Sequence, residues 1–463
     1  MAETITAIST ALGEGGIGIV RVSGPASEFI MRSVMKDCPK VIEARHAYMS
    51  KVVNEKAEVI DEAVFIFMKA PASYTGEDML EIQAHGNNVS LREILATVLR
   101  CNDSRIRMAE PGEFTKLAFL NGKMDLSQAE AVIDIIKAKS ELSLEIAESQ
   151  HEGRLSKEIK EIRGKILDIL AEMAVDIDYP DEDIAETLNN ELINSIKDIK
   201  NDVLVLKNTS NIGKIAREGI KIAIIGKPNV GKSSLMNAML GEGRAIVTDI
   251  PGTTRDTVEE SLTLGGIPAV LVDTAGLRET SDLVEKIGIE RAETATVEAD
   301  LIVLVLDGSK KLDSEDQKII DFIKKTGNDK VMVILNKQDL GKAITTADIS
   351  SKIETLKIIQ TSLKGAKISD TVKEISDAIV SILELGNVHI HESNIITSER
   401  HLNLLIKALE NLEESVGLLQ NDEPIEVAEL SLKYAYNQLG NIIGEEVGDE
   451  VLDTVFSKFC LGK

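Results

Sequence analysis

Residues 226–233 have the spacing of a loop that binds nucleotide phosphates: Gly226, four further residues, then Gly231, Lys232 and Ser233. The glycines let backbone N–H groups turn inward around phosphate oxygens. Lys232 can reach the β and γ oxygens, and the Ser233 hydroxyl can bind Mg²⁺. The apolar run Ile222–Ile225 precedes this loop, and a helical pattern follows it. The sequence therefore predicts a phosphate-binding loop between a buried strand and a helix.

Two later segments predict that the bound base is guanine. Asp339 comes shortly after the apolar run Val331–Leu335. Its carboxylate can accept hydrogen bonds from N1–H and the exocyclic amine of guanine, groups that adenine does not present. The main chain of residues 362–364 is placed to support the base from behind. The residues of these two segments predicted to bind the nucleotide are Asn336, Lys337, Asp339, Ser362, Leu363 and Lys364.

Residues 252–276 predict the contacts to the γ-phosphate and its metal. Asp273 ends the apolar run Ala269–Val272, so its carboxylate can hold the Mg²⁺ shell, while the N–H of Gly276 can reach a γ-phosphate. A threonine hydroxyl, from Thr253 or Thr254, can complete that shell when GTP is bound. The other residues predicted to bind the nucleotide are Asn229, Val230, Ser234, Thr248, Thr253, Thr274 and Ala275.

The block from Ile220 to Leu385 is similar to the G domain of translation-factor-class GTPases. Leu277 stands where Ras-like GTPases carry the glutamine that orients the attacking water, so another group must hold that water. The amide oxygen of Asn229 can join backbone carbonyls around a monovalent cation, and K⁺ there can neutralise developing charge as an arginine finger does. The acidic candidates nearby are Glu279, Asp282 and Glu285.

The elements that must position these residues fall into distinct blocks. The first 120 or so residues mix β-type runs such as Ala63–Met68 with the helical stretch Ser90–Leu99, which predicts an α/β or α+β domain. Glycines between 13 and 18 have dinucleotide-loop spacing, but β-type residues follow, so we interpret them as a strand-linking turn. Apolar residues at helical spacing flank the nucleotide block on both sides.

We therefore predict a multidomain α/β plus α protein, in which a helical bundle is split by an inserted Ras-like P-loop G domain. The predicted boundaries are 1–121 for the N-terminal domain, 122–215 and 384–463 for the two parts of the helical domain, and 216–383 for the G domain.

Composition limits the classes of function and the compartment. The chain has 463 residues and a net charge of −25, which repels nucleic-acid backbones unless a local basic patch or a second protein holds them. Three cysteines without metal-site spacing fit a reducing compartment, and no apolar stretch is long enough to span a membrane. We expect a cytoplasmic protein with no membrane partner.

Residues 451–463 predict a final helix followed by a short tail. Apolar residues from Val451 to Phe459 keep helical spacing, which predicts a final helix docked on the bundle and a tail, Cys460–Lys463, aimed in a fixed direction. The tail is either a frayed end in which Cys460 is a small core residue, or a segment inserted into a pocket.

The split helical block, the inserted G domain and the ending Cys460–Lys463 resemble the MnmE (TrmE) family of tRNA uridine-modification GTPases over essentially the whole chain. The resemblance implies a homodimer joined through tetrahydrofolate-binding-like N-terminal domains. It also implies a flavoprotein partner, MnmG (GidA), and tRNA as the substrate. The implied product carries an aminomethyl or carboxymethylaminomethyl group at carbon 5 of the wobble uridine, with 5-formyl- or methylene-tetrahydrofolate as one-carbon source.

Carried over by position, the resemblance implies several ligand sets. Glu285 would orient the attacking water, and Cys460 would be a catalytic or a structural residue. Cations suit the folate glutamate tail and formyl oxygen, and a carboxylate suits the pterin amino face. The implied sets are Arg21, Glu81, Lys123 and Lys463 for folate, Asn229, Thr248, Ile250 and Thr253 for K⁺, and Ser233 and Thr254 for Mg²⁺.

Two other classes of GTPase compete with this interpretation. An RNA-binding switch in ribosome assembly is disfavoured by the acidic charge, and the basic residues from Arg154 to Arg163 alternate with Glu158 and Glu161, which we interpret as a solvated helix face. A dynamin-like membrane GTPase is disfavoured because no basic amphipathic or lipid-anchor segment is present.

Overall fold

The computed structural model describes residues 3–101, 106–178, 185–242, 259–273, 296–326, 330–363, 368–382 and 394–463. The chain forms two compact units. The first unit comprises Met1–Ile133, Gln150–Ile196 and Glu410–Lys463, and the second comprises Asp134–Ser149 and Lys197–Leu409. The domain boundaries near residues 121, 215 and 383 stay predictions.

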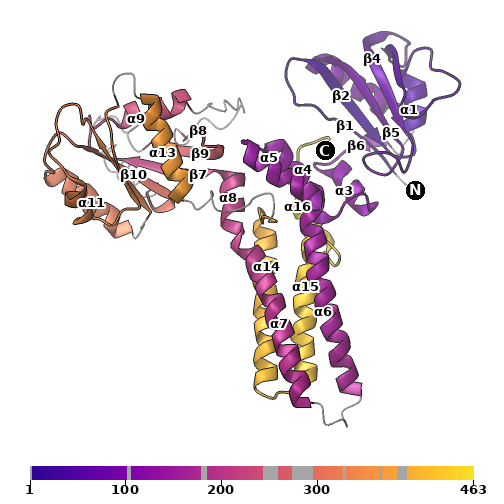
Figure 1. Ribbon diagram of the computed structural model, residues 1–463. Coiled ribbons are helices and arrows are strands. Elements are labelled where there is room, and N and C mark those ends of the chain that lie inside the picture. The colour runs from indigo at the N-terminus through magenta and orange to yellow at the C-terminus, as the bar shows by residue number, and fades with distance from the viewer. Residues whose placement is uncertain are drawn as a thin grey trace, which may run out of the picture. The chain divides into compact units, whose positions relative to one another are not determined.

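The N-terminal part of the first unit is a sheet of six described strands in the order β3-β4-β5-β2-β1-β6 (Figure 1). All neighbours are antiparallel except β1 and β6, which are parallel. β1 and β2 form a hairpin in which Ile8 lies opposite Val20, so the chain does turn between two strands here. The interpretation of the whole glycine-rich segment as the turn is wrong, because Gly15, Gly16 and Gly18 already belong to β2, with a register shift between Gly15 and Gly18. The strands are β1 Thr4–Ile8, β2 Gly15–Ser23, β3 Ala47–Val53, β4 Val59–Met68, β5 Met79–Gly86 and β6 Ile106–Met108.

Three helices accompany this sheet: α1 Ser27–Val34, α2 Asn88–Arg100 and α3 Glu113–Leu120. Alternate residues of a strand face the same side, so Phe65 of β4 and Leu80 and Ile82 of β5 form one apolar surface. Ile30 of α1 and Ile94 of α2 are fully buried in the same cluster. The expected mixed α/β domain is confirmed.

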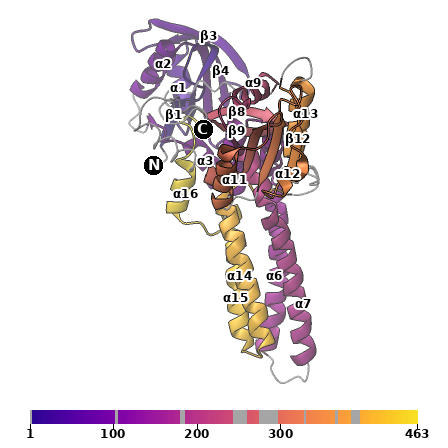
Figure 2. The same cartoon turned by 90° about the vertical axis from the view of Figure 1, so that its left-hand side faces the viewer.

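The long helices carry the apolar spacing that the sequence predicted. α6 and α15 lie side by side in both views (Figure 1 and Figure 2). Leu155, Ile159 and Ile166 of α6 are fully buried, as periodicity of 3.6 residues requires. The helices of this region are α4 Leu126–Lys137, α5 Glu141–His151, α6 Arg154–Asp178, α7 Ala185–Asn208, α14 Glu399–Gln420, α15 Ile425–Ile443 and α16 Asp449–Phe456.

One prediction for α6 is wrong. Arg163, expected on a solvated face, is 8% exposed. Its guanidinium lies 4.0 Å from the ring centroid of Tyr436 and pairs with Glu445. The guanidinium also lies against Gly440, where an added Cβ would be 3.0 Å from Arg163 Cζ. Alternating charge along a helix does not reveal which side a neighbouring helix will cover. Arg163 therefore belongs to the packing between α6 and α15.

The final helix docks as expected. Val455 and Phe456 of α16, with Phe459 just after it, pack against Leu126 and other residues of α4. The expectation of burial fails only for Val451, which is 42% exposed at the start of the helix.

The second unit contains a sheet of six described strands in the order β12-β11-β10-β7-β9-β8, parallel except for the antiparallel pair of β8 and β9. Apolar clusters lie on its two faces, which explains why β10 and β11 read as continuous apolar runs. The elements are α8 Ser210–Glu218, β7 Ile220–Ile225, α9 Lys232–Glu242, β8 Glu259–Leu264, β9 Ile267–Asp273, β10 Leu301–Asp307, α11 Ser314–Thr326, β11 Val331–Asn336, α12 Thr346–Ser350, β12 Lys357–Gln360 and α13 Ile368–Ile382.

This topology confirms the predicted P-loop α/β fold. The loops after β7, β11 and β12 all leave the carboxyl edge of a parallel sheet, where such folds bind ligands. Within the described ranges, no helix has the length and apolar character needed to cross a membrane.

Candidate active site

The phosphate-binding loop joins β7 to α9 and is shaped by two glycines. Gly226 has φ +153°, and a Cβ there would lie 2.3 Å from the carbonyl oxygen of Val305 in β10. Gly231 has φ +112°, and a Cβ there would lie 2.1 Å from the side-chain nitrogen of Asn336. Any larger residue at either position would push the loop away from the sheet.

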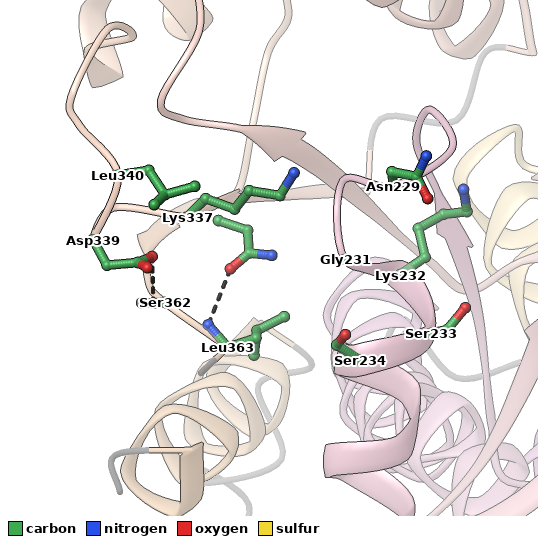
Figure 3. Close-up of a pocket in the computed structure, with 11 residues that line it drawn as sticks. Asn229, Gly231, Lys232, Ser233, Ser234, Lys337, Asp339, Leu340, Ser362 and Leu363 are labelled. Atoms are coloured by element: carbon green, nitrogen blue, oxygen red, sulfur yellow. Dashed lines mark hydrogen bonds between the residues drawn. The ribbon is translucent and has the colours of Figure 1, made fainter. Parts of the chain in front are cut away.

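A pocket of about 360 Å³ opens between this loop and the loops that follow β11 and β12 (Figure 3). It joins the predicted phosphate contacts to the predicted base contacts in one cavity. Leu340, which is 66% exposed, is a lining residue that the sequence analysis missed. Its position directly after Asp339 could have predicted that it lines the same pocket. The lining residues are Asn229, Gly231, Lys232, Ser233, Ser234, Asn336, Lys337, Asp339, Leu340, Ser362 and Leu363.

The base end of the pocket is held by side-chain hydrogen bonds (Figure 3). Ser362 Oγ donates to Asp339 Oδ1 at 2.6 Å, which orients the carboxylate. The backbone N–H of Leu363 donates to Asn336 Oδ1 at 3.1 Å. Asn336 Nδ2 in turn donates to the carbonyl of Val230 at 2.8 Å. Asn336 therefore ties the base loop to the phosphate loop, and its contact with the nucleotide stays a prediction.

Val230 was predicted to contact the nucleotide, but its side chain is 2% exposed and lies in the apolar cluster under the sheet. Its carbonyl accepts the hydrogen bond from Asn336, and a contact between its backbone and the nucleotide stays a prediction. The residue anchors the loop.

Two lysines bring positive charge to the pocket. Lys232 Nζ donates to the carbonyl oxygens of Gly226 at 2.7 Å and Lys227 at 2.8 Å, so the ammonium is held against the loop. Lys337 Nζ lies 2.9 Å from Asp307 Oδ2. Although partial burial disfavours the charged carboxylate, hydrogen bonds from Lys337 and Ser309 lower the pKa of Asp307. The aspartate therefore stays ionised and fixes Lys337 beside the base loop.

A second group of predicted ligands meets in the first unit. Arg21 of β2 and Glu81 of β5 are directly opposite in the antiparallel register, and Arg21 Nη2 lies 2.8 Å from Glu81 Oε1. The other arm of the guanidinium, Nη1, donates to the carbonyl of Gly462 at 3.4 Å. Burial first, and then the neighbouring Arg21, lower the pKa of Lys463. Three of the four residues expected to bind folate thus lie together.

The fourth residue, Lys123, has a different partner: its Nζ donates to the carbonyl of Pro71 at 3.1 Å. The side chain of Lys123 also passes Gly76, where an added Cβ would lie 3.4 Å from Lys123 Cγ. Two residues before Gly76 is Tyr74, whose ring centroid lies 5.7 Å from the Arg21 guanidinium. A contact between Lys123 and a ligand at Arg21 stays a prediction.

The end of the C-terminal tail packs against β1, and its insertion into a pocket stays a prediction. Gly462 has φ +88°, and a Cβ there would lie 2.4 Å from the carbonyl oxygen of Ile8. The tail therefore lies against the β1–β2 hairpin. Cys460 is exposed, so the alternative of a small core residue is wrong, and the neighbouring Phe459 fills the apolar cluster in its place.

The similarity of the sequence to known proteins extends over the whole chain. A family model described as "GTP-binding protein TrmE N-terminus" matches residues 4–123, and one described as "MnmE helical domain" matches residues 126–460. The chain belongs to the MnmE family. Among curated MnmE proteins, the tRNA modification GTPase of Clostridioides difficile is 45% identical over 100% of this chain and 99% of its own length. The tRNA modification GTPase MnmE of Alkaliphilus oremlandii is 43% identical over 100% of this chain and 99% of its own length.

A solved structure, the G domain of the FeoB iron transporter of T. maritima, is 27% identical, covers 35% of this chain and 98% of its own length, and has a TM-score of 0.27. As an MnmE-family protein, this chain is a P-loop GTP hydrolase of tRNA modification.

Several ligands predicted for this MnmE-family chain lie outside the described residues. They include the γ-phosphate contacts, three of the four K⁺ ligands and the acid expected to orient water. For Asp273, which ends β9, the backbone alone is described. The predicted residues outside the description are Thr248, Ile250, Thr253, Thr254, Thr274, Ala275, Gly276, Glu285 and Lys364.

Proposed function

We propose that this chain hydrolyses GTP with Mg²⁺ and K⁺ and couples the cycle to modification of tRNA wobble uridine at carbon 5. It would act as a homodimer joined through the N-terminal domain, with the flavoprotein MnmG (GidA) as partner and 5-formyl- or methylene-tetrahydrofolate as one-carbon source. The product would carry an aminomethyl or carboxymethylaminomethyl group. The observation that supports this proposal best is the pocket between a phosphate-binding loop and Asp339, in a chain similar over its full length to tRNA modification GTPases.

The described residues fit the ligands of the GTPase reaction. Loop N–H groups and Lys232 would bind the phosphates, and Asp339 would read guanine. The Ser233 hydroxyl lines the pocket and suits Mg²⁺, which prefers oxygen ligands, with Thr254 as its proposed partner. Asn229 lines the pocket with φ +61° and presents an amide group to the same space (Figure 3), as a K⁺ ligand would. When bound, both cations would neutralise charge that develops on the phosphate oxygens.

The cluster of Arg21, Glu81 and Lys463 fits an anionic ligand. The Arg21 guanidinium pairs with Glu81, and burial, followed by the charge of Arg21, lowers the pKa of Lys463. An anion placed there would stabilise the ammonium form of Lys463. The glutamate tail of a folate supplies such an anion, and bidentate binding by a guanidinium suits a carboxylate.

Nucleoside analysis of tRNA tests the proposed function directly. Cells that lack this protein should lose the carbon-5 group on the wobble uridine, and a plasmid copy should restore it. The purified chain should also bind a formyl-tetrahydrofolate. A ribosome-assembly GTPase would leave the uridine modified and would bind no folate, so that pair of results would contradict the proposal.

Hydrolysis should depend on K⁺ and on Glu285. We expect a rate at least about tenfold higher in K⁺ than in Na⁺ at matched ionic strength, because Leu277 replaces the usual glutamine and Asn229 is placed to help bind a cation. Glu285→Ala should lower kcat by roughly 100-fold or more and leave nucleotide affinity nearly unchanged, since general-base positioning acts in the transition state. Glu279→Ala, a nearby acid, is the control. Equal rates in both salts would contradict the cation assignment.

A further inference from the structure

Lys227, the residue after Gly226 in the phosphate-binding loop, has its side chain turned away from solvent, with 17% exposed. Its Nζ lies 2.5 Å from Asp313 Oδ2 and 2.9 Å from Asp316 Oδ2. Both carboxylates stand at the start of α11, and the Asp316 side chain is only 7% exposed. One loop lysine is therefore bound by two acids from a neighbouring helix.

The two acids are held in place by the helix itself. Asp313 Oδ1 accepts the backbone N–H groups of Glu315 at 2.9 Å and Asp316 at 3.1 Å, as a residue that caps a helix does. Asp316 Oδ2 accepts the backbone N–H of Asp313 at 3.1 Å. The hydrogen bond from Lys227, followed by those from the backbone, lowers the pKa of Asp313 to about 2. The backbone of α11 thus orients both carboxylates toward the lysine.

The main chain of Lys227 connects this ion pair to the phosphate site. Its carbonyl is one of the two that accept Lys232 Nζ, at 2.8 Å. Pro228 follows and restricts the backbone of Lys227 to extended conformations, and Asn229 then takes φ +61°. A shift of the Lys227 side chain would therefore move both the carbonyl that orients Lys232 and the backbone that presents Asn229.

Two other contacts hold the loop in place, one on each side of Lys227. Gly226 lies against the carbonyl of Val305, and the carbonyl of Val230 accepts from Asn336. Between these points, the side chain of Lys227 carries the ion pairs to α11. Removing them would leave residues 227–229 held at their two ends and by the hydrogen bond from Lys232 Nζ to the carbonyl of Lys227.

We propose that Lys227 is a positioning residue for phosphate binding: its ion pairs with Asp313 and Asp316 fix the first half of the loop on α11 and thereby aim Lys232 at the nucleotide phosphates. This inference rests on GTP binding in the proposed pocket. It differs from a direct role, in which Lys227 would leave the acids and contact phosphate itself. The two roles predict opposite effects of removing the acids.

The test compares Lys227→Met, Asp313→Asn combined with Asp316→Asn, and all three changes together. In each, the dissociation constants of GTP, GDP and GMP and the steady-state kinetics are measured. Loss of the ion pairs should weaken GTP and GDP roughly 10- to 100-fold, because a misplaced loop loses its aligned phosphate contacts. GMP, which lacks the β-phosphate that this loop holds, should change less than about twofold. The triple variant should bind GTP no more weakly than the weaker-binding of the other two variants, since all three changes break the same set of ion pairs.

Two controls separate positioning from general stability. Lys227→Arg keeps the charge, and a guanidinium can donate to both carboxylates, so affinity should recover to within about threefold. Lys221→Met on β7 removes an exposed pair with Glu298 at 3.8 Å and should change neither affinity nor melting temperature measurably. If the Asp316 change lowers the melting temperature, Asp313→Asn alone, at a more exposed side chain, serves as the acid variant.

Tighter GTP binding after removal of the acids would show that Lys227 is a direct phosphate ligand and would overturn the proposal. Equal weakening of GMP and GTP would overturn it as well, because the effect would then be general loss of fold. If the unaltered chain does not bind GTP, the proposed function fails instead, independently of these comparisons.

Discussion

Asp339→Asn should weaken GTP binding roughly 10- to 100-fold, because the variant faces the guanine N1–H and amine with a donor where a carboxylate oxygen was. In the parent, Ser362 Oγ already orients the Asp339 carboxylate through a hydrogen bond of 2.6 Å. The parent therefore needs no rearrangement of Asp339 to bind GTP, and nothing offsets the loss in the variant. Titration of the purified variant with a labelled GTP analogue measures the change.

The same variant should gain affinity for a xanthine nucleotide. Xanthine carries an oxygen where guanine carries the amine, so the new amide can donate to that oxygen and accept from N1–H. This gain also serves as the folding control, since a misfolded pocket would bind neither base. GTP binding equal to that of the parent would show that Asp339 does not read the base.

Deletion of Cys460–Lys463 should abolish uridine modification and weaken folate binding by at least about tenfold, while GTP hydrolysis stays near the parental rate. The deletion removes Lys463 and the carbonyl that accepts from Arg21 at 3.4 Å, which together form one side of the cationic cluster. The GTP pocket is built entirely from the second unit and does not use the tail. Parental modification by the truncated chain would contradict the role assigned to the tail.

Two single changes separate the functions of the tail. Gly462→Ala keeps every charge but places a Cβ 2.4 Å from the carbonyl of Ile8, so it should dislodge the tail and reproduce most of the loss in folate binding. Cys460→Ser lies at an exposed position and should leave folate binding intact. Loss of modification in that variant alone would assign Cys460 a chemical role near the one-carbon unit.

The nucleotide site was predictable from sequence because its chemistry is local. A phosphate-binding loop needs glycines, a lysine and a hydroxyl within eight residues, and these occupy 226–233 between a strand and a helix as expected. The base-reading segment follows a buried strand, and parallel strands bring their carboxyl ends to one edge. Asn229 and Lys232 therefore meet Asp339 and Ser362 in one pocket, although more than a hundred residues separate the first pair from the second.

The cluster of Arg21, Glu81 and Lys463 could be predicted only from the family resemblance. Arg21 and Glu81 are sixty residues apart and face each other because the register of β2 and β5 pairs them, which no spacing rule reveals. Lys463 joins them because the last helix docks on α4 and turns the tail toward the β1–β2 hairpin.

Three features were decided by tertiary structure alone. Arg163 has the charge pattern of a surface residue, yet α15 covers it. Cys460 looks like a core residue beside Phe459, yet the helix direction places Phe459 inward and Cys460 outward. Lys227 is an indifferent position of the loop motif until α11 brings two carboxylates to it. Sequence determined the chemistry that neighbouring residues share along the chain, whereas contacts between distant elements depend on packing directions, which periodicity leaves open.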